Sequence, residues 1–347
     1  MSNDVIIESN NAVGVMRLNR PKALHTLNLG MCEDMLSAAQ SWLGQDDIKL
    51  VLLKHSEGRG FCAGGDIRSM YDSVDEGGKY SQAFFYTEYQ LNHLLYTYAK
   101  PTLVLMDGIT MGGGVGIAMP CRYRVATEHT RFAMPETGIG LFPDVGGAWY
   151  LPRLSHNMGT YMALTGEPVR GINCLKLGLA THYVSSEKLP ELELALMANP
   201  EQVETILSEF CETAGDTEFD EVMAFSESEL NGYDVNEISS RLAANDSPLA
   251  QKTLATIQSK SPLSTVASMK ALELGATATT FAQEMTREYT LACNLTAHPD
   301  FKEGVRALLV DKDNQPKWAH TDIASVSDED VSVLFENNSD LKTWVPA

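Results

Sequence analysis

Two glycine clusters are the residues of this sequence whose type and spacing could do chemistry. They are the segments 63–66 (Ala-Gly-Gly-Asp) and 111–114 (Met-Gly-Gly-Gly), and each follows a short apolar run of the kind that forms strands. Glycine lets a backbone approach a ligand closely, and the start of a helix presents N–H groups that lack partners. Two such groups aimed at one point would form an oxyanion hole for a carbonyl oxygen. Either cluster alone would also fit a tight turn of an α/β domain.

Three acidic residues are the candidate acids and bases near these clusters. Glu88 lies in an amphipathic helical stretch, where an isolated glutamate is usually solvated. Glu136 follows a proline and could instead cap a helix. Asp144 lies within Phe-Pro-Asp-Val-Gly-Gly and could simply shape a turn, although such an apolar setting is unusual for a carboxylate.

The predicted elements that must position these residues recur in the order strand, turn, helix. Residues 5–18 read as a β-hairpin, and residues 31–43 carry apolar side chains at helical spacing. The apolar runs 50–53 and 102–106 read as strands that lead toward the two glycine clusters. The sequence therefore predicts stacked ββα units up to about residue 185.

The composition changes between residues 187 and 238. This stretch contains fifteen acidic side chains and one basic side chain, Lys188. Its apolar residues keep helical spacing, as Val203, Ile206, Leu207 and Phe210 illustrate. We therefore expect an acidic helical insert here rather than a disordered segment.

The bulk properties restrict the partners of the chain. Its 347 residues are 44% hydrophobic, which supports a sizeable core, and the net charge is −20. This charge argues against nucleic acid or an anionic membrane surface as a partner. Six cysteines are scattered without metal-like spacing, and the first residues show no basic or apolar targeting stretch. The expectation is a cytoplasmic protein with no metal site and no membrane segment.

Four motifs in order resemble the signature of the crotonase (enoyl-CoA hydratase/isomerase) superfamily, and more narrowly its 3-hydroxyisobutyryl-CoA hydrolase branch. They lie at residues 61–67, 108–116, 132–137 and 140–147. The resemblance implies an α/β fold, a crotonase-like ββα spiral with a C-terminal helical region. The expected division is a spiral core over 1–255, which includes the acidic insert, and a helical region over 256–347 that packs on it.

The resemblance also assigns roles at the site. It places the oxyanion-hole amides at Gly65 and Gly113, and it makes Glu136 and Asp144 catalytic. Hydratases of this superfamily use two glutamates, but Gly116 stands where one of them is expected, and Asp144 stands where hydratases usually have glycine. Position 116 lies on the helix expected to begin at the second glycine cluster, so a glutamate introduced there would face the same cavity as Glu136, unless the neighbouring backbone leaves no room for a side chain.

Substrate contacts are also implied by the resemblance. Glu88, Gly113, Glu136 and Asp144 would contact the acyl part of the substrate. Two segments would hold coenzyme A: Lys22, Ala23 and Leu24 would run along the pantetheine and phosphates, and Ala63, Gly64, Gly65 and Asp66 would hold the adenine and the thioester. Weaker candidates for the phosphates are Lys302, Lys312 and Lys317.

These observations favour one function over two alternatives. The expected reaction is hydrolysis of 3-hydroxyisobutyryl-CoA to 3-hydroxyisobutyrate and CoA in valine degradation, with no cofactor because CoA is part of the substrate. Glu136 would act as a general base toward water or as a nucleophile that forms a mixed anhydride. The alternatives are an enoyl-CoA hydratase or isomerase and a non-catalytic acyl-CoA binding protein. The resemblance also allows for a homo-oligomer.

Overall fold

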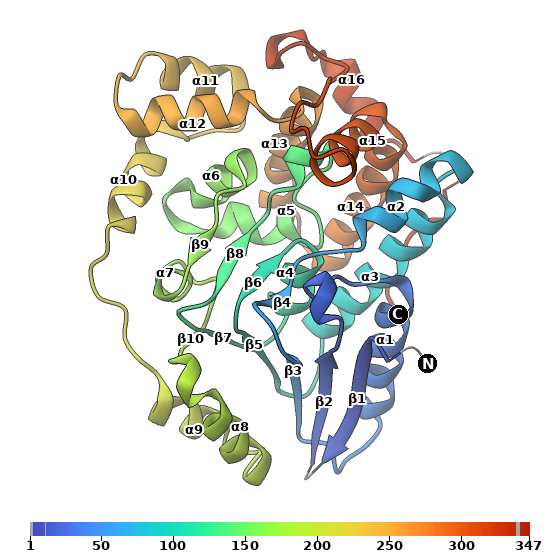
Figure 1. The fold of residues 1–347 in the computed structure, drawn as a ribbon, viewed down its shortest axis with the longest axis vertical. Helices are drawn as coiled ribbons and strands as arrows, with labels where there is room; N and C mark the ends of the chain where they lie inside the picture. Colours follow the sequence, from blue (N-terminus) through green and yellow to red (C-terminus); the bar gives the residue numbers. More distant parts are fainter. Residues whose placement is uncertain (1–2, 11, 338–340) are drawn as a thin grey trace.

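The larger of two sheets forms the base of the fold. The structure is a computed structural model that describes residues 3–10, 12–337 and 341–347. Six strands lie in the order β1-β2-β3-β5-β7-β10 (Figure 1). Their bounds are β1 Val5–Asn10, β2 Val13–Leu18, β3 Leu50–His55, β5 Thr102–Met106, β7 Tyr123–Ala126 and β10 His182–Tyr183. β1 and β2 form the predicted antiparallel hairpin, and the other neighbours pair in parallel.

The smaller sheet carries the segments that lead into the glycine clusters. Its order is β4-β6-β8-β9, with β4 Gly60–Cys62, β6 Ile109–Met111, β8 Arg131–Ala133 and β9 Val169–Arg170. β4, β6 and β8 are parallel, so their carboxyl ends meet at one edge of the sheet. This edge brings together three segments far apart in sequence, which begin at Ala63, Gly112 and Met134.

Helices cover both sheets. In the first part of the chain they are α1 Leu29–Leu43, α2 Ile67–Ser73, α3 Lys79–Tyr96, α4 Gly113–Ala118, α5 Gly147–Tyr150, α6 Met158–Thr165 and α7 Ile172–Lys176. The rest are α8 Leu189–Ala198, α9 Val203–Phe210, α10 Phe219–Glu229, α11 Val235–Ala243, α12 Pro248–Gln258, α13 Pro262–Ala276, α14 Phe281–Ala297, α15 Pro299–Val305 and α16 Asp328–Ser332. The strand and helix repeats predicted for the first 185 residues are therefore present.

Side chains along the central strands point alternately to the two faces of the larger sheet, and this divides the core into two parts. Leu50 and Leu52 of β3 face a cluster that α8 and α9 cover, whereas Val51 and Leu53 face the main core. Both sets are buried, as expected for a parallel strand covered on two sides. The continuous apolar run that predicted this strand thus reflects burial of both faces.

The acidic stretch 187–238 is helical, as predicted, but it does not form one compact unit. Its helices α8 and α9 lie at one end of the molecule, and α11 lies beside α12 at the other end (Figure 1). α10 and the segment before it connect the two ends. The predicted domain boundary at residue 255 falls within α12, and the division into two domains stays a prediction.

Candidate active site

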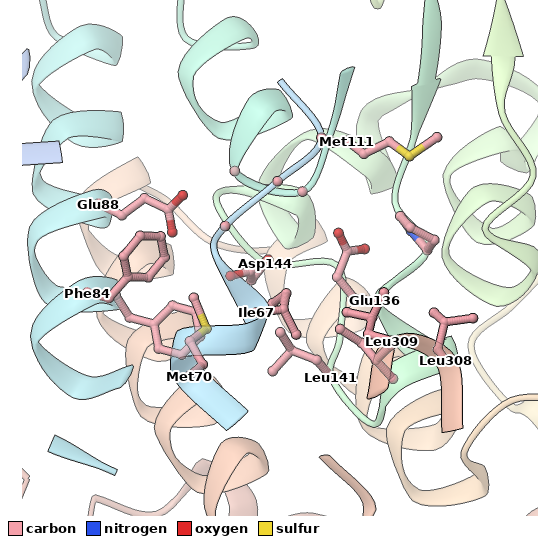
Figure 2. A pocket seen from close by; sticks show the side chains of 18 residues that line it. Ile67, Met70, Phe84, Glu88, Met111, Glu136, Leu141, Asp144, Leu308 and Leu309 are labelled. Atoms are coloured by element: carbon pink, nitrogen blue, oxygen red, sulfur yellow. The ribbon is translucent and has the colours of Figure 1, made fainter. Parts of the chain in front are cut away.

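One pocket brings together all five residues that were predicted for catalysis or for contact with the acyl group. Gly65, Glu88, Gly113, Glu136 and Asp144 all line a cavity of about 140 Å³. Glu88 and Glu136 face the cavity from opposite sides, and Asp144 lies between them (Figure 2). The remaining walls are mostly apolar and come from Ala63, Gly64, Ile67, Met70, Phe84, Phe85, Met111, Gly112, Pro135, Ile139, Leu141, Leu308 and Leu309.

The two predicted oxyanion amides are available for a ligand. Within the described residues, the backbone N–H groups of Gly65 and Gly113 donate to no protein acceptor. Gly113 is the first residue of α4, where an N–H has no partner within the helix. A methyl group added at Gly113 would lie 3.3 Å from the amide nitrogen of Gly65, so the two segments meet at one point. The turn before it needs glycine, because Gly112 has φ 48° and ψ −122°.

Glu88 projects from α3 against the second glycine cluster. Its side chain is almost fully buried, and Oε1 has no hydrogen-bond partner among the described residues. A methyl group at Gly113 would lie only 2.3 Å from this oxygen, so the position must be glycine for the carboxyl to fit. Burial, reinforced by the charge of Asp144, raises the pKa of Glu88 well above its usual range. Glu88 is therefore predisposed to hold a proton and to donate a hydrogen bond.

Glu136 begins a short 3-10 helix, Glu136–Ile139, that follows β8. It is 6% exposed, and Oε2 lacks a partner in the part of the chain that the structure describes. Burial and the nearby charge of Asp144 raise the pKa of Glu136 well above its usual range. A buried carboxyl group with one free oxygen at the pocket wall is suited to accept a proton or to attack an acyl group.

Asp144 is held in place by a hydrogen bond from a residue that the sequence analysis did not assign. The hydroxyl of Tyr89, one position after Glu88 on α3, donates to Oδ2 of Asp144 at 2.7 Å. Burial raises the pKa of Asp144 to about 7, although this hydrogen bond acts in the opposite direction. The pairing depends on how α3 packs against the loop after Glu136, so no local sequence signal indicates it.

The two predicted coenzyme A segments lie side by side. Lys22, Ala23 and Leu24 form a short 3-10 turn and its end, and the N–H of Ala63 donates to the carbonyl of Leu24 at 3.0 Å. Ala63, Gly64 and Gly65 line the pocket, whereas Lys22 is exposed outside it.

Asp66 was predicted to bind coenzyme A, but its side chain also has partners within the protein. Its side chain caps α2 and pairs with Arg20 at 3.1 Å. Contact of either coenzyme A segment with the ligand stays a prediction.

The three candidate phosphate lysines lie outside the pocket. Lys302 pairs with Asp75, and Lys312 and Lys317 are exposed on the segment after the turn 306–310. That turn is π-helical and carries Leu308 and Leu309, which are 46% and 44% exposed at the pocket wall. Sequence reasoning missed both leucines, because nothing in their spacing distinguishes them from core residues.

Position 116 is closely surrounded by other atoms. The first side-chain carbon there would lie 2.6 Å from Cβ of Val145 and 2.8 Å from Nδ2 of Asn92. Real Cβ atoms do not approach other atoms this closely, so this backbone has no room for a glutamate at Gly116. The alternative that neighbouring atoms leave no room for a side chain at 116 is therefore the one that this backbone supports, and the direction in which a glutamate there would point stays a prediction.

The structure also bears on metal binding and on membrane insertion. Within residues 3–10, 12–337 and 341–347, no three His, Cys, Asp or Glu side chains are grouped so that they could hold a metal ion. No helix in the same residues combines the length and apolar character needed to cross a membrane.

The comparisons with known proteins agree with this geometry. Residues 13–335 match the family described as enoyl-CoA hydratase/isomerase, and the chain belongs to this family. Among named relatives, the 3-hydroxyisobutyryl-CoA hydrolase, mitochondrial, of Gallus gallus is 40% identical, over 98% of this chain and 91% of its own length. The protein of the same name from Homo sapiens is 39% identical, over 98% and 90%.

Solved structures confirm the fold. A carnitinyl-CoA dehydratase from Mycobacterium thermoresistibile has a TM-score of 0.93 at 34% identity and covers 98% of each chain. An enoyl-CoA hydratase from Rhodobacter sphaeroides 2.4.1 has a TM-score of 0.89 at 32% identity, over 96% of this chain and 97% of that one. The predicted crotonase-like α/β class is confirmed.

Proposed function

We propose that this protein hydrolyses the thioester of 3-hydroxyisobutyryl-CoA, an intermediate of valine degradation. The observation that carries the proposal is that one small, mostly apolar pocket holds three buried carboxyl groups and two backbone amides that have no partner among the described residues. Full-length relatives at about 40% identity bear the name of this hydrolase, which supports the choice of acyl group.

The two amides and Glu136 would act on the thioester carbonyl, the amides by binding its oxygen and Glu136 by promoting attack on its carbon. The thioester oxygen would lie between the N–H groups of Gly65 and Gly113, which stabilise the charge that develops on it. Glu136 would then remove a proton from an attacking water, or attack the carbonyl carbon itself and leave an anhydride for water to cleave. When water attacks, the C–S bond breaks and the proton that Glu136 took goes to the departing sulfur. When Glu136 attacks, CoA leaves as a thiolate, which takes a proton from the water that cleaves the anhydride.

Asp144 and Glu88 would recognise the acyl chain. An Asp144 carboxylate can accept a hydrogen bond from the β-hydroxyl, and a protonated Glu88 can donate one to the substrate. A charge-assisted bond of this kind contributes roughly 1.5–3 kcal/mol, which corresponds to roughly a ten- to hundredfold preference for the hydroxylated chain.

The test is a thiol-release assay with 3-hydroxyisobutyryl-CoA and isobutyryl-CoA, run beside a hydration assay with crotonyl-CoA. Rapid thiol release from the hydroxylated thioester, with little hydration, is the expected result. Hydration without thiol release would instead favour the enoyl-CoA hydratase alternative, and binding without turnover would favour an acyl-CoA binding protein. A single turnover in isotopically labelled water tests the anhydride route, because label enters Glu136 only if water cleaves an anhydride at the carboxyl carbon of Glu136.

The cellular setting of the reaction is part of the proposal. A cytoplasmic location stays a prediction, which fractionation of the source cells would test, and homo-oligomer formation stays one that light scattering would test. The relatives named above carry the word mitochondrial in their names.

A further inference from the structure

A buried glutamate of α14 lies against the turn that carries Asp144. Glu288 is 1% exposed, and it does not line the pocket. Its Oε2 accepts a hydrogen bond from the backbone N–H of Gly146 at 2.6 Å, and its Oε1 accepts one from the N–H of Ala148 at 3.0 Å. Both carboxyl oxygens are therefore committed to the backbone just after Asp144.

This turn is unfavourable without external support. Val145 has φ 54°, a left-handed conformation that a β-branched residue rarely adopts, and Gly146 follows with φ 89°. Strained residues of this kind persist only where the surroundings hold them, and they gather at functional sites. The two bonds to Glu288 and the bond from Tyr89 to Asp144 hold the turn from two sides.

We propose that Glu288 is a positioning residue, which fixes the turn so that Asp144 points into the pocket. We call the two hydrogen bonds from Gly146 and Ala148 to Glu288 the clamp. The role of Asp144 rests on the proposed function, but the clamp itself is a property of the fold. Glu288 has no free oxygen to exchange a proton with substrate, and it acts only through Asp144.

Glu288→Gln tests the clamp, because the amide replaces one accepting oxygen with an NH₂ group that faces a backbone N–H. The matched control is Glu284→Gln, one turn earlier on α14, since Glu284 is also fully buried but pairs with Arg287 instead of the turn. With 3-hydroxyisobutyryl-CoA we expect Glu288→Gln to lower kcat on the order of 10- to 100-fold and to reduce the preference over isobutyryl-CoA. The control should change neither quantity.

A double-mutant cycle separates positioning from general damage. In an Asp144→Asn background, adding Glu288→Gln should cause almost no further loss of kcat, because the residue that it positions has already been disabled. An equal fold-loss in both backgrounds would overturn the proposal. If Glu288→Gln does not fold, Glu288→Asp serves instead, since the shorter side chain cannot reach both N–H groups.

Hydrogen exchange measures the protection of the Gly146 and Ala148 amides and does not depend on catalytic activity. Glu288→Gln should speed exchange of the Gly146 and Ala148 amides, and Glu284→Gln should not. Unchanged exchange in Glu288→Gln would overturn the proposal whatever the activity. If the unmodified protein fails to hydrolyse 3-hydroxyisobutyryl-CoA, the proposed function fails while this measurement still decides on the clamp.

Discussion

Replacing Asp144 with asparagine should lower activity and, at the same time, stabilise the fold above neutral pH. Burial raises the pKa of Asp144 from 3.8 to about 7, so the folded state resists ionisation that the unfolded chain accepts freely. A raised carboxyl pKa leaves the folded state unpenalised below pH 3.8, and the penalty grows as pH rises until it is complete above about pH 7. Asparagine mimics the neutral form and carries no such penalty.

The size of the effect follows from the shift. At about 1.36 kcal/mol per unit, the raised pKa of Asp144 costs the folded state about 4 kcal/mol at pH 8, where Asp144 is ionised, and about 2 kcal/mol at pH 5.5, where the folded state keeps the proton that the unfolded chain loses. The gain from Asp144→Asn should therefore be about 2 kcal/mol larger at pH 8 than at pH 5.5. Loss of the Asp144 charge also relieves Glu88 and Glu136, whose pKa values it raises, and this acts in the same direction.

Urea denaturation of both proteins at the two pH values measures this difference. Asp246→Asn is the control, because Asp246 is exposed and removing its charge should change the free energy of unfolding by less than about 0.5 kcal/mol at either pH. A stability difference between Asp144→Asn and the unmodified protein that is the same at both pH values would refute the reasoning. It would mean that the pKa of Asp144 in the folded protein is close to its value in the unfolded chain.

Three further substitutions test the rest of the site. Glu136→Gln should lower kcat on the order of 10²- to 10⁴-fold. In the unmodified protein, the rate should rise with pH through the raised pKa of Glu136, because only the ionised form reacts. A rate that does not depend on pH would remove Glu136 from the mechanism. Leu309→Ala should raise KM roughly three- to tenfold with little change in kcat, whereas Leu194→Ala, a 71% exposed leucine away from the pocket, should change neither. Gly116→Ala should lower the free energy of unfolding by about 1–3 kcal/mol, because the new Cβ would lie 2.6 Å from Cβ of Val145. Gly30→Ala is the control and should be close to neutral, because its nearest contact would be at 3.6 Å. Chemical denaturation measures both.

The sequence was sufficient to predict the class of fold and the residues that meet at the pocket. Long motifs marked the two glycine clusters and the acidic residues, and parallel strands that end at one sheet edge bring Ala63 and Gly112 together. The acidic helices were also predicted, but their separation to two ends of the molecule was not. Helical spacing reports which face of a helix is buried and says nothing about the surface that buries it.

Residues that act across the fold were harder to predict. Glu284 and Glu288 do have a signal, because they lie in the apolar stripe that includes Phe281 and Met285, where a charged residue is unexpected unless it has partners. Tyr89 and Leu309 have no such signal. Their roles depend on which loop packs beside them, and that is a property of tertiary structure alone.

The glycine at position 116 and the aspartate at position 144 are physically linked. Val145 lies directly over Gly116, at 2.6 Å from where a Cβ would be, and its left-handed conformation is part of the turn that presents Asp144. A glutamate at 116 and this turn would compete for the same space, so the two arrangements exclude each other. A glutamate at position 116 therefore requires the turn around Val145 to be rebuilt at the same time, because its Cβ does not fit beside Val145 in this backbone.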